Sequence, residues 1–217
     1  MLTIDLTIAL LVQMLDSIDS VPSRGFIHRD IKPSNFVIGK GDSSGKVYII
    51  DFGLAKKHLQ NNVPIPKRKN ADFRGTITYA SLNAHLKKDL SRRDDLWSFY
   101  FVIMDFFNAN LPWKNISNRD EVAQVKSRCL RNPIKYLWNQ NNPTEGGFDY
   151  KIKDVKQLKD IFYHIQNLKY ESEPNYQLIR MLLLEIRNDY LRQCNPKIPP
   201  SFENVPRMEP PVQKNVP

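Results

Sequence analysis

The sequence has 217 residues, of which 41% are hydrophobic and 25% charged, and these values argue against a disordered low-complexity chain and for one globular domain with or without a tail. The net charge of +9 indicates acidic partners, either nucleic acid, an anionic membrane or an acidic or phosphorylated protein, without choosing among them. Cys129 and Cys194 form no Cys-x-x-Cys pair, which argues against a disulfide framework or a zinc site and favours a reducing compartment, cytoplasmic or nuclear.

The first segment is strongly apolar and predicts a helix from Thr3 to Val21 that ends near Pro22. Its main face carries Ile4, Ile8, Leu11, Leu15 and Ile18. The segment has neither the basic start nor the cleavage site of a signal peptide, and it is too short to cross a bilayer. We therefore expect a helix buried in the protein core and no membrane span.

A β-hairpin is predicted next, because the runs "NFVIG" and "KVYIID" are rich in strand-forming residues and are separated by the turn-forming "KGDSSG". Apolar residues do not recur at a regular interval along residues 52–81, so this segment is predicted to be a long functional loop. Further helices are expected at 94–108, 119–130, 155–168 and 175–192, with a polar surface loop at 139–150. The predicted fold is mainly α with one small β-hairpin, followed by a proline-rich, disordered tail.

Two short motifs flank the predicted hairpin and carry the chemistry. His28-Arg29-Asp30, with Lys32 and Asn35, precedes the first strand, and Asp51-Phe52-Gly53 follows the second. Both are protein-kinase signatures, and either one alone would be weak. Phosphoryl transfer needs a proton acceptor, a cation near the γ-phosphate and oxygen ligands for Mg²⁺. Asp30 is the candidate proton acceptor and Lys32 the candidate cation. Asn35 and Asp51 are the candidate metal ligands, and Lys32, Asn35 and Asp51 together are expected to contact Mg-ATP.

Several stretches along the chain resemble the casein kinase 1 group of serine/threonine kinases, and most closely its tau-tubulin kinase branch. They are "GFIHRDIKPSNF", "IIDFGLAKK", "FRGTITYASLNAH", "RRDDLWS", "LPW" and "EPNYQLI". The resemblance covers about residues 2–192 and implies the C-terminal lobe of a kinase domain. We therefore expect this lobe at residues 1–193 and the tail at 194–217, with ATP and Mg²⁺ as cofactors, protein substrates and a monomeric state.

The resemblance also implies roles for further residues. Thr76 is expected to bridge Asp30 and Lys32, so that Asp30, Lys32, Asn35 and Thr76 form the catalytic set. Asp95 is expected to brace the backbone of the catalytic loop, although an aspartate in the first turn of a helix also suits the helix dipole. The role implied for His28 is structural.

The sequence departs from the family at the segment that selects substrates. The group usually has an arginine at the position of Thr78, where it contributes to an anion site for acidic or phosphorylated substrates. We hypothesise that nearby basic residues compensate for its loss, namely Lys67, Arg68, Lys69 and Arg74. No Gly-rich loop, Val-Ala-Ile-Lys lysine, αC glutamate or hinge occurs in the 217 residues, and these are the kinase parts that hold adenine and the α- and β-phosphates.

Three interpretations stay open from the sequence. The first is a fragment of an active serine/threonine kinase, which the intact catalytic residues favour. The second is an inactive scaffold or binding module for acidic protein partners, formed by the C-terminal lobe alone. The third is a nucleic-acid-binding protein, which ranks lowest because no recognised binding motif is present and the aromatic residues are not interleaved with the basic clusters.

Overall fold

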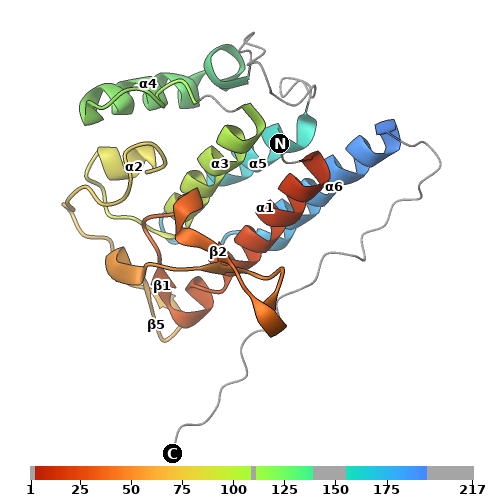
Figure 1. Cartoon of the computed structure of the whole chain (residues 1–217). Helices are drawn as coiled ribbons and strands as arrows, with labels where there is room; N and C mark the ends of the chain where they lie inside the picture. The colour runs from red at the N-terminus through yellow and green to blue at the C-terminus, as the bar shows by residue number, and fades with distance from the viewer. Residues whose placement is uncertain (1–2, 109–110, 139–154, 195–217) are drawn as a thin grey trace, which may run out of the picture.

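The computed structural model describes residues 3–108, 111–138 and 155–194, and helices dominate it (Figure 1). The α-helices are α1 (Ile4–Asp19), α2 (Leu82–His85), α3 (Arg92–Asn108), α4 (Arg119–Arg131), α5 (Lys156–Asn167) and α6 (Tyr176–Cys194). A π-helical turn, Ile134–Trp138, follows α4. The predicted fold class, mainly helical with a small β-hairpin, is confirmed.

The strands are short and pair antiparallel in two-stranded sheets. The predicted hairpin is present as β2 (Phe36–Ile38) and β3 (Val47–Ile49), with Phe36 opposite Ile49. Two further pairs, β1 (Phe26–Ile27) with β4 (Lys56–Lys57) and β5 (Leu59–Gln60) with β6 (Val63–Pro64), were not predicted. β4 to β6 lie inside residues 52–81, so the first part of the predicted long loop contains short paired strands.

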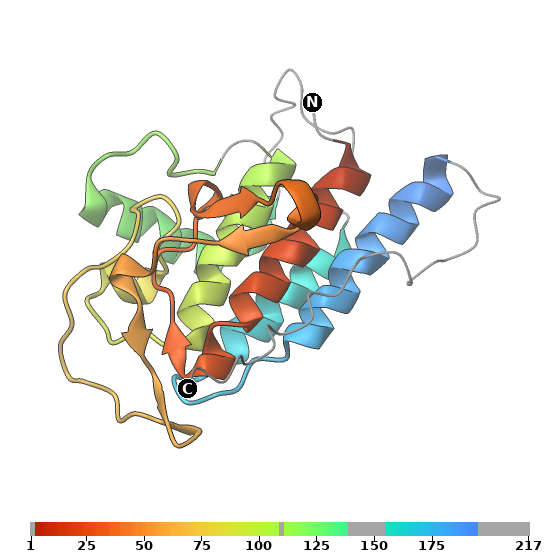
Figure 2. The same ribbon diagram turned by 60° about the horizontal axis from the view of Figure 1, so that its bottom comes forward.

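Helix α3 lies at the centre of the core, because it is buried on all sides along residues 99–104. It packs against α1 and α5, and α6 packs against α1 and α5; α1, α3, α5 and α6 are called the helical layer below (Figures 1 and 2). Phe162 of α5 is fully buried and meets the edges of Trp97 and Tyr100 at centroid distances of 5.2 and 5.6 Å. Close-packed aromatic rings therefore hold the helical layer together.

Helix α1 also holds the β2–β3 hairpin, which crosses over it in Figure 2. The backbone amide of Val47 donates to Oε1 of Gln13 at 3.0 Å, and the Val47 carbonyl accepts from the hydroxyl of Ser17 at 2.9 Å. These bonds satisfy both polar groups of a buried backbone unit. They fix the hairpin, and with it the positions of Asn35 and Asp51 at its two ends.

The helix boundaries differ from the predicted ones by a few residues. Helix α1 ends at Asp19 rather than Val21, because Pro22 begins a separate 3₁₀ turn, Pro22–Arg24. The short helix α2 was not predicted; its N-cap is Ser81, whose Oγ accepts from the amide of Ala84. The predicted surface loop at 139–150 and tail residues 195–217 lie outside the described residues. Among the described residues, no helix combines the length and apolar character needed to cross a membrane.

Candidate active site

The segment His28–Asn35, between β1 and β2, is braced by the first turn of α3. Asp95 accepts from the backbone amide of His28 at 2.7 Å and from that of Arg29 at 2.8 Å. Arg29 has a positive φ of 70°, an uncommon conformation for a residue with a side chain. Burial raises the pKa of Asp95 to about 7, although the two amide donors favour the charged form. The structure thus confirms Asp95 as the brace of the catalytic loop.

Both carboxylate oxygens of Asp30 are engaged by residues that the sequence singled out. Oδ1 accepts from the backbone amide of Thr76 at 2.8 Å and from its hydroxyl at 2.7 Å, and Oδ2 lies 2.8 Å from Nζ of Lys32. Lys32 Nζ also donates to Oγ1 of Thr76 at 3.2 Å, so the Thr76 hydroxyl bridges Asp30 and Lys32. Burial alone would raise the pKa of Asp30, but the bonds from Lys32 and Thr76 outweigh it and lower the pKa. Asp30 is therefore ionised at neutral pH.

The close approach of Thr76 to Asp30 depends on Gly75. Gly75 has a φ of +102°, and a Cβ at this position would lie 2.7 Å from the carbonyl oxygen of Arg29. Such a contact is far inside van der Waals distance, so a side chain here would push the segment away from the catalytic loop. Gly75 is thus required to bring residues 75–80 against Asp30.

His28 has a structural environment, as the resemblance implies. Its ring is fully buried, Nε2 donates to the carbonyl of Ile50 at 3.0 Å, and Nδ1 accepts from the amide of Asp30 at 3.3 Å. Burial lowers its pKa, so the ring is neutral at pH 7. It links the catalytic loop to the strand that leads to Asp51.

Asn35 and Asp51 fit a Mg²⁺ site on their donor chemistry. The Asn35 amide nitrogen donates to the carbonyl of Asp30 at 2.9 Å, which leaves the side-chain oxygen as the free ligand. The carbonyl of Asn35 accepts from the amide of Ile50 at 2.9 Å, which brings Asp51 next to Asn35. Asp51 is exposed, and Oδ1 accepts from the amide of Gly53 at 3.3 Å. Mg²⁺ commonly takes one or two protein oxygens and fills its other positions with water or phosphate, so this pair suffices.

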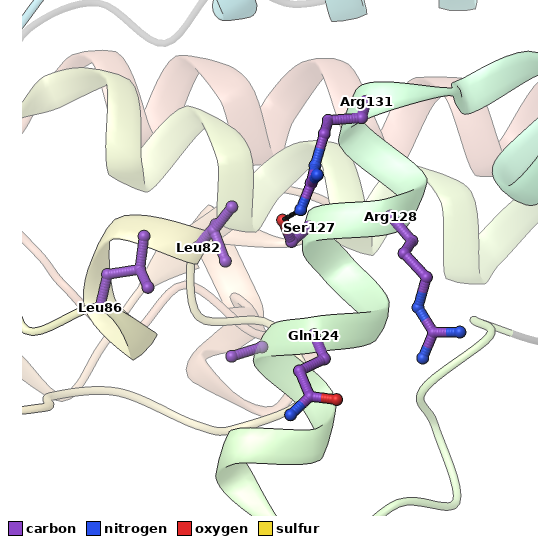
Figure 3. A pocket seen from close by; sticks show the side chains of 7 residues that line it. Leu82, Leu86, Gln124, Ser127, Arg128 and Arg131 are labelled. Atoms are coloured by element: carbon purple, nitrogen blue, oxygen red, sulfur yellow. Dashed lines mark hydrogen bonds between the residues drawn. The ribbon is translucent and has the colours of Figure 1, made fainter.

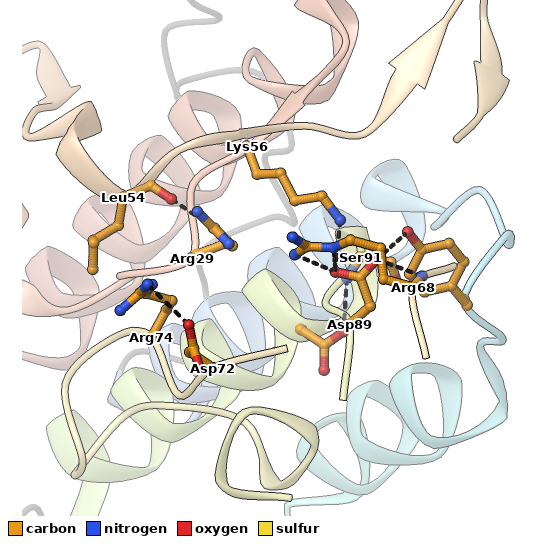
Figure 4. Close-up of polar contacts among 10 residues, drawn as sticks. Arg29, Leu54, Lys56, Arg68, Asp72, Arg74, Asp89 and Ser91 are labelled. Carbon is orange, nitrogen blue, oxygen red and sulfur yellow. Dashed lines mark hydrogen bonds and ion pairs between the residues drawn. The ribbon is translucent and has the colours of Figure 1, made fainter. Parts of the chain in front are cut away.

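Sequence reasoning missed Asp89, which organises a second polar cluster beside the catalytic loop (Figure 4). Asp89 is almost fully buried and accepts from Lys56 Nζ at 2.6 Å, from the backbone and guanidinium of Arg68, and from the hydroxyl of Tyr170. Arg29 donates through Nε to the carbonyl of Leu54 at 2.6 Å. These bonds hold residues 54–68 against Asp89, which precedes α3, and against Arg29 of the catalytic loop. No local pattern could have predicted them, because the partners are 21 to 81 residues apart.

The sequence also missed Lys126, a fully buried lysine on α4. Its Nζ donates to the carbonyls of Ile77 and Ala80 at 2.8 and 2.6 Å, and lies 3.3 Å from Nε2 of His85. The rings of Phe101 and Trp113 cover it at 4.9 and 5.1 Å from their centroids. Burial lowers the pKa of Lys126 well below its usual value. Lys126 thus ties α4 to residues 75–80, the segment that contacts Asp30.

The comparisons with known proteins agree with this geometry. The model of the protein kinase domain family matches residues 2–188, and the chain belongs to this family. A probable serine/threonine-protein kinase of Dictyostelium discoideum is 39% identical over 180 residues, which cover 82% of this chain. That alignment covers 33% of the relative, so the chain spans about a third of the relative's length.

Proposed function

We propose that this chain is the C-terminal lobe, at residues 1–193, of a serine/threonine protein kinase of the casein kinase 1 group, closest to the tau-tubulin kinase branch. The reaction is transfer of the γ-phosphoryl group of ATP to a serine or threonine hydroxyl of a protein. The contact set of Asp30 with Lys32 and Thr76 carries the proposal, because it joins an ionised carboxylate, a cation and a hydroxyl donor within hydrogen-bond distance.

In this reaction Asp30 orients the substrate hydroxyl and accepts its proton, since its lowered pKa keeps it ionised and a carboxylate oxygen can accept more than one hydrogen bond. Thr76 fixes the orientation of the carboxylate through Oδ1, and Lys32 directs positive charge toward the transferred group. Asn35 and Asp51 would hold Mg²⁺, which would neutralise the charge that develops on the phosphoryl group supplied by ATP.

A preference for acidic or phosphorylated substrates belongs to the proposal. Lys67, Lys69 and Arg74 are exposed near residues 75–80 in the sequence, and they support it. Arg68 is a weaker candidate, because its guanidinium is engaged with the buried carboxylate of Asp89. A peptide array that shows no preference for acidic residues or phosphoserine would contradict this part.

We expect the chain by itself to bind ATP weakly, because the kinase elements that hold adenine and the α- and β-phosphates do not occur in its sequence. Apolar side chains around the hairpin and the Asp51-Phe52-Gly53 motif are about half exposed, as a surface that packs against a nucleotide-holding lobe would be: Val37, Ile38, Ile50 and Phe52. The same observation favours the alternative function, an inactive scaffold that binds protein partners through this face.

The test compares the 217-residue chain with a fusion in which the nucleotide-holding lobe of an active serine/threonine protein kinase precedes it. Phosphoryl transfer from labelled ATP to an acidic serine/threonine peptide is measured with Mg²⁺ for each protein and for its Asp30→Asn variant. We expect transfer by the fusion, and a loss of about 10²- to 10⁴-fold in the variant, because the proton acceptor is removed. A folded fusion whose activity does not depend on Asp30 would overturn the kinase assignment and favour the scaffold.

A further inference from the structure

A groove lies between α2 and α4 (Figure 3). Its volume is about 400 Å³, enough for one or two bulky side chains of a partner. The lining residues are Leu82, Leu86, Ala123, Gln124, Ser127, Arg128 and Arg131. None of them belongs to the catalytic set, so the groove is a separate feature of the molecule.

The α2 wall of the groove is apolar. Leu82 and Leu86 are four residues apart and therefore lie on the same side of the short helix. Leu86 is 51% exposed, an unusual amount for a leucine in a concave position. A partner that covers the Leu86 side chain would gain roughly 25 cal/mol of binding free energy for each Å² of apolar surface removed from water. This wall therefore selects a bulky apolar side chain.

The α4 wall of the groove is basic. Arg131 donates to Oγ of Ser127 at 2.8 Å, which holds its guanidinium along the groove (Figure 3). Arg128 also lines a second hollow of about 260 Å³, on its other side, together with Val125 and Tyr136. Arg128 thus lines both hollows, and a carboxylate or phosphate of a partner that occupies both would pair with its guanidinium.

The groove is held in a fixed position relative to the active site. Helix α4 presents Arg128 and Arg131 to the groove and Lys126 to the core, where Lys126 binds the carbonyls of Ile77 and Ala80. The same segment carries Thr76, which contacts Asp30. A partner seated between α2 and α4 would therefore be anchored to the same unit that holds the catalytic aspartate.

We propose that the groove between α2 and α4 is a docking site for an acidic segment of a protein substrate, which places an apolar side chain on either side of a carboxylate. Its use by substrates rests on the proposed kinase function, whereas the binding itself does not. Charge complementarity favours an acidic segment, because Arg128 and Arg131 make the α4 side of the groove cationic. Leu82 and Leu86 make the α2 side apolar, which favours apolar side chains next to the carboxylate. The chain as a whole is also basic, with a net charge of +9.

The test measures binding of fluorescein-labelled peptides to the 217-residue chain by anisotropy, without ATP. One peptide has leucines flanking two glutamates, a second has lysines in place of the glutamates, and a third has serines in place of the leucines. We expect the first to bind at least 10-fold more tightly than either of the others. The double variant Arg128→Glu with Arg131→Glu should weaken this binding by 10-fold or more, and Leu86→Ser by several-fold.

The matched control is Lys40→Glu with Lys46→Glu, which makes the same change in charge on two exposed residues of the β2–β3 turn. It should leave binding within 2-fold. An equal loss in the control, or equal binding of the serine peptide, would show only non-specific attraction and overturn the proposal. Self-association of the chain that depends on Arg128 would assign the groove to a second copy and would also overturn it. Failure of phosphoryl transfer with peptide binding intact would leave the docking site standing.

Discussion

In the helical layer, large apolar side chains are fully buried against one another, whereas the segments around Asp30 are held by single carboxylates that accept from backbone amides and cations. Phe162 represents the first kind of contact, and Asp89 and Asp95 the second. Buried area is spread over many residues, whereas each of these carboxylates accepts several hydrogen bonds at one point of the fold. The difference indicates that the helical layer sets global stability, while the carboxylates set the geometry of the active site.

The largest expected effect on stability comes from Phe162→Ala in the helical layer. Phe162 is fully buried among aromatic rings, so its truncation leaves a cavity and should lower the free energy of unfolding by about 3–5 kcal/mol. The measurement is urea denaturation followed by tryptophan fluorescence. Tyr163→Ala is the neighbouring control: its side chain is 44% exposed, and we expect a loss of about 1 kcal/mol or less. If both variants lost the same free energy of unfolding, buried apolar area would not be what stabilises the helical layer.

The next largest effect is a dependence of stability on pH, which comes from His58, a buried residue that packs against Tyr170. His58 is fully buried, and its ring nitrogens have no hydrogen-bond partner among the described residues. Burial, helped by Arg92 and Lys56, lowers its pKa from 6.5 to about 4. Between these values the unfolded chain binds the proton and the folded chain does not, so stability falls as pH decreases from 6.5 to 4, by on the order of 3 kcal/mol.

Unfolding free energies of wild type and His58→Leu, measured between pH 4 and 7.5, test this expectation. The variant should have a shallower slope over that interval, because leucine does not titrate. His85 remains in both proteins, and its pKa is lowered to about 4 by burial and by Lys126, so part of the slope should persist. Identical slopes would show that His58 takes up its proton in the folded state as readily as in the unfolded state.

A smaller effect is expected for Asp89→Asn, which removes the charge that Lys56 and Arg68 share. We expect a loss of about 2 kcal/mol, since hydrogen bonds to a charged group are weakened but the side chain keeps its shape. Because Asp89 anchors residues 54–68, limited proteolysis there should accelerate more than global unfolding does. Asp72→Asn, at an exposed ion pair with Arg74, is the control and should change neither measurement. If both variants behave alike, Asp89 does not organise this segment.

The long helices and the catalytic signatures were predictable from the sequence, because both depend on spacing along a short stretch of chain. Ile4 to Ile18 recur at helical intervals, and Asp30, Lys32 and Asn35 lie within one loop. The β5–β6 turn was missed although the sequence carried a signal, the pair Asn61-Asn62. Asparagine tolerates the positive φ that a two-residue hairpin turn requires, and both residues adopt it. Lys126 was missed because a lysine within a helix is normally read as exposed. Asp89 was missed because its partners come together only in the folded chain.

The burial of Lys126 has a consequence for chemical labelling of the protein. The amine is fully buried, donates to two carbonyls and is covered by aromatic rings, so an acylating reagent in solution cannot reach it. Lys126 will therefore react only in molecules in which α4 has moved away from Ile77 and Ala80. Where this single lysine is labelled faster than the chain unfolds globally, the labelling rate measures how often the segment against Asp30 loses its support.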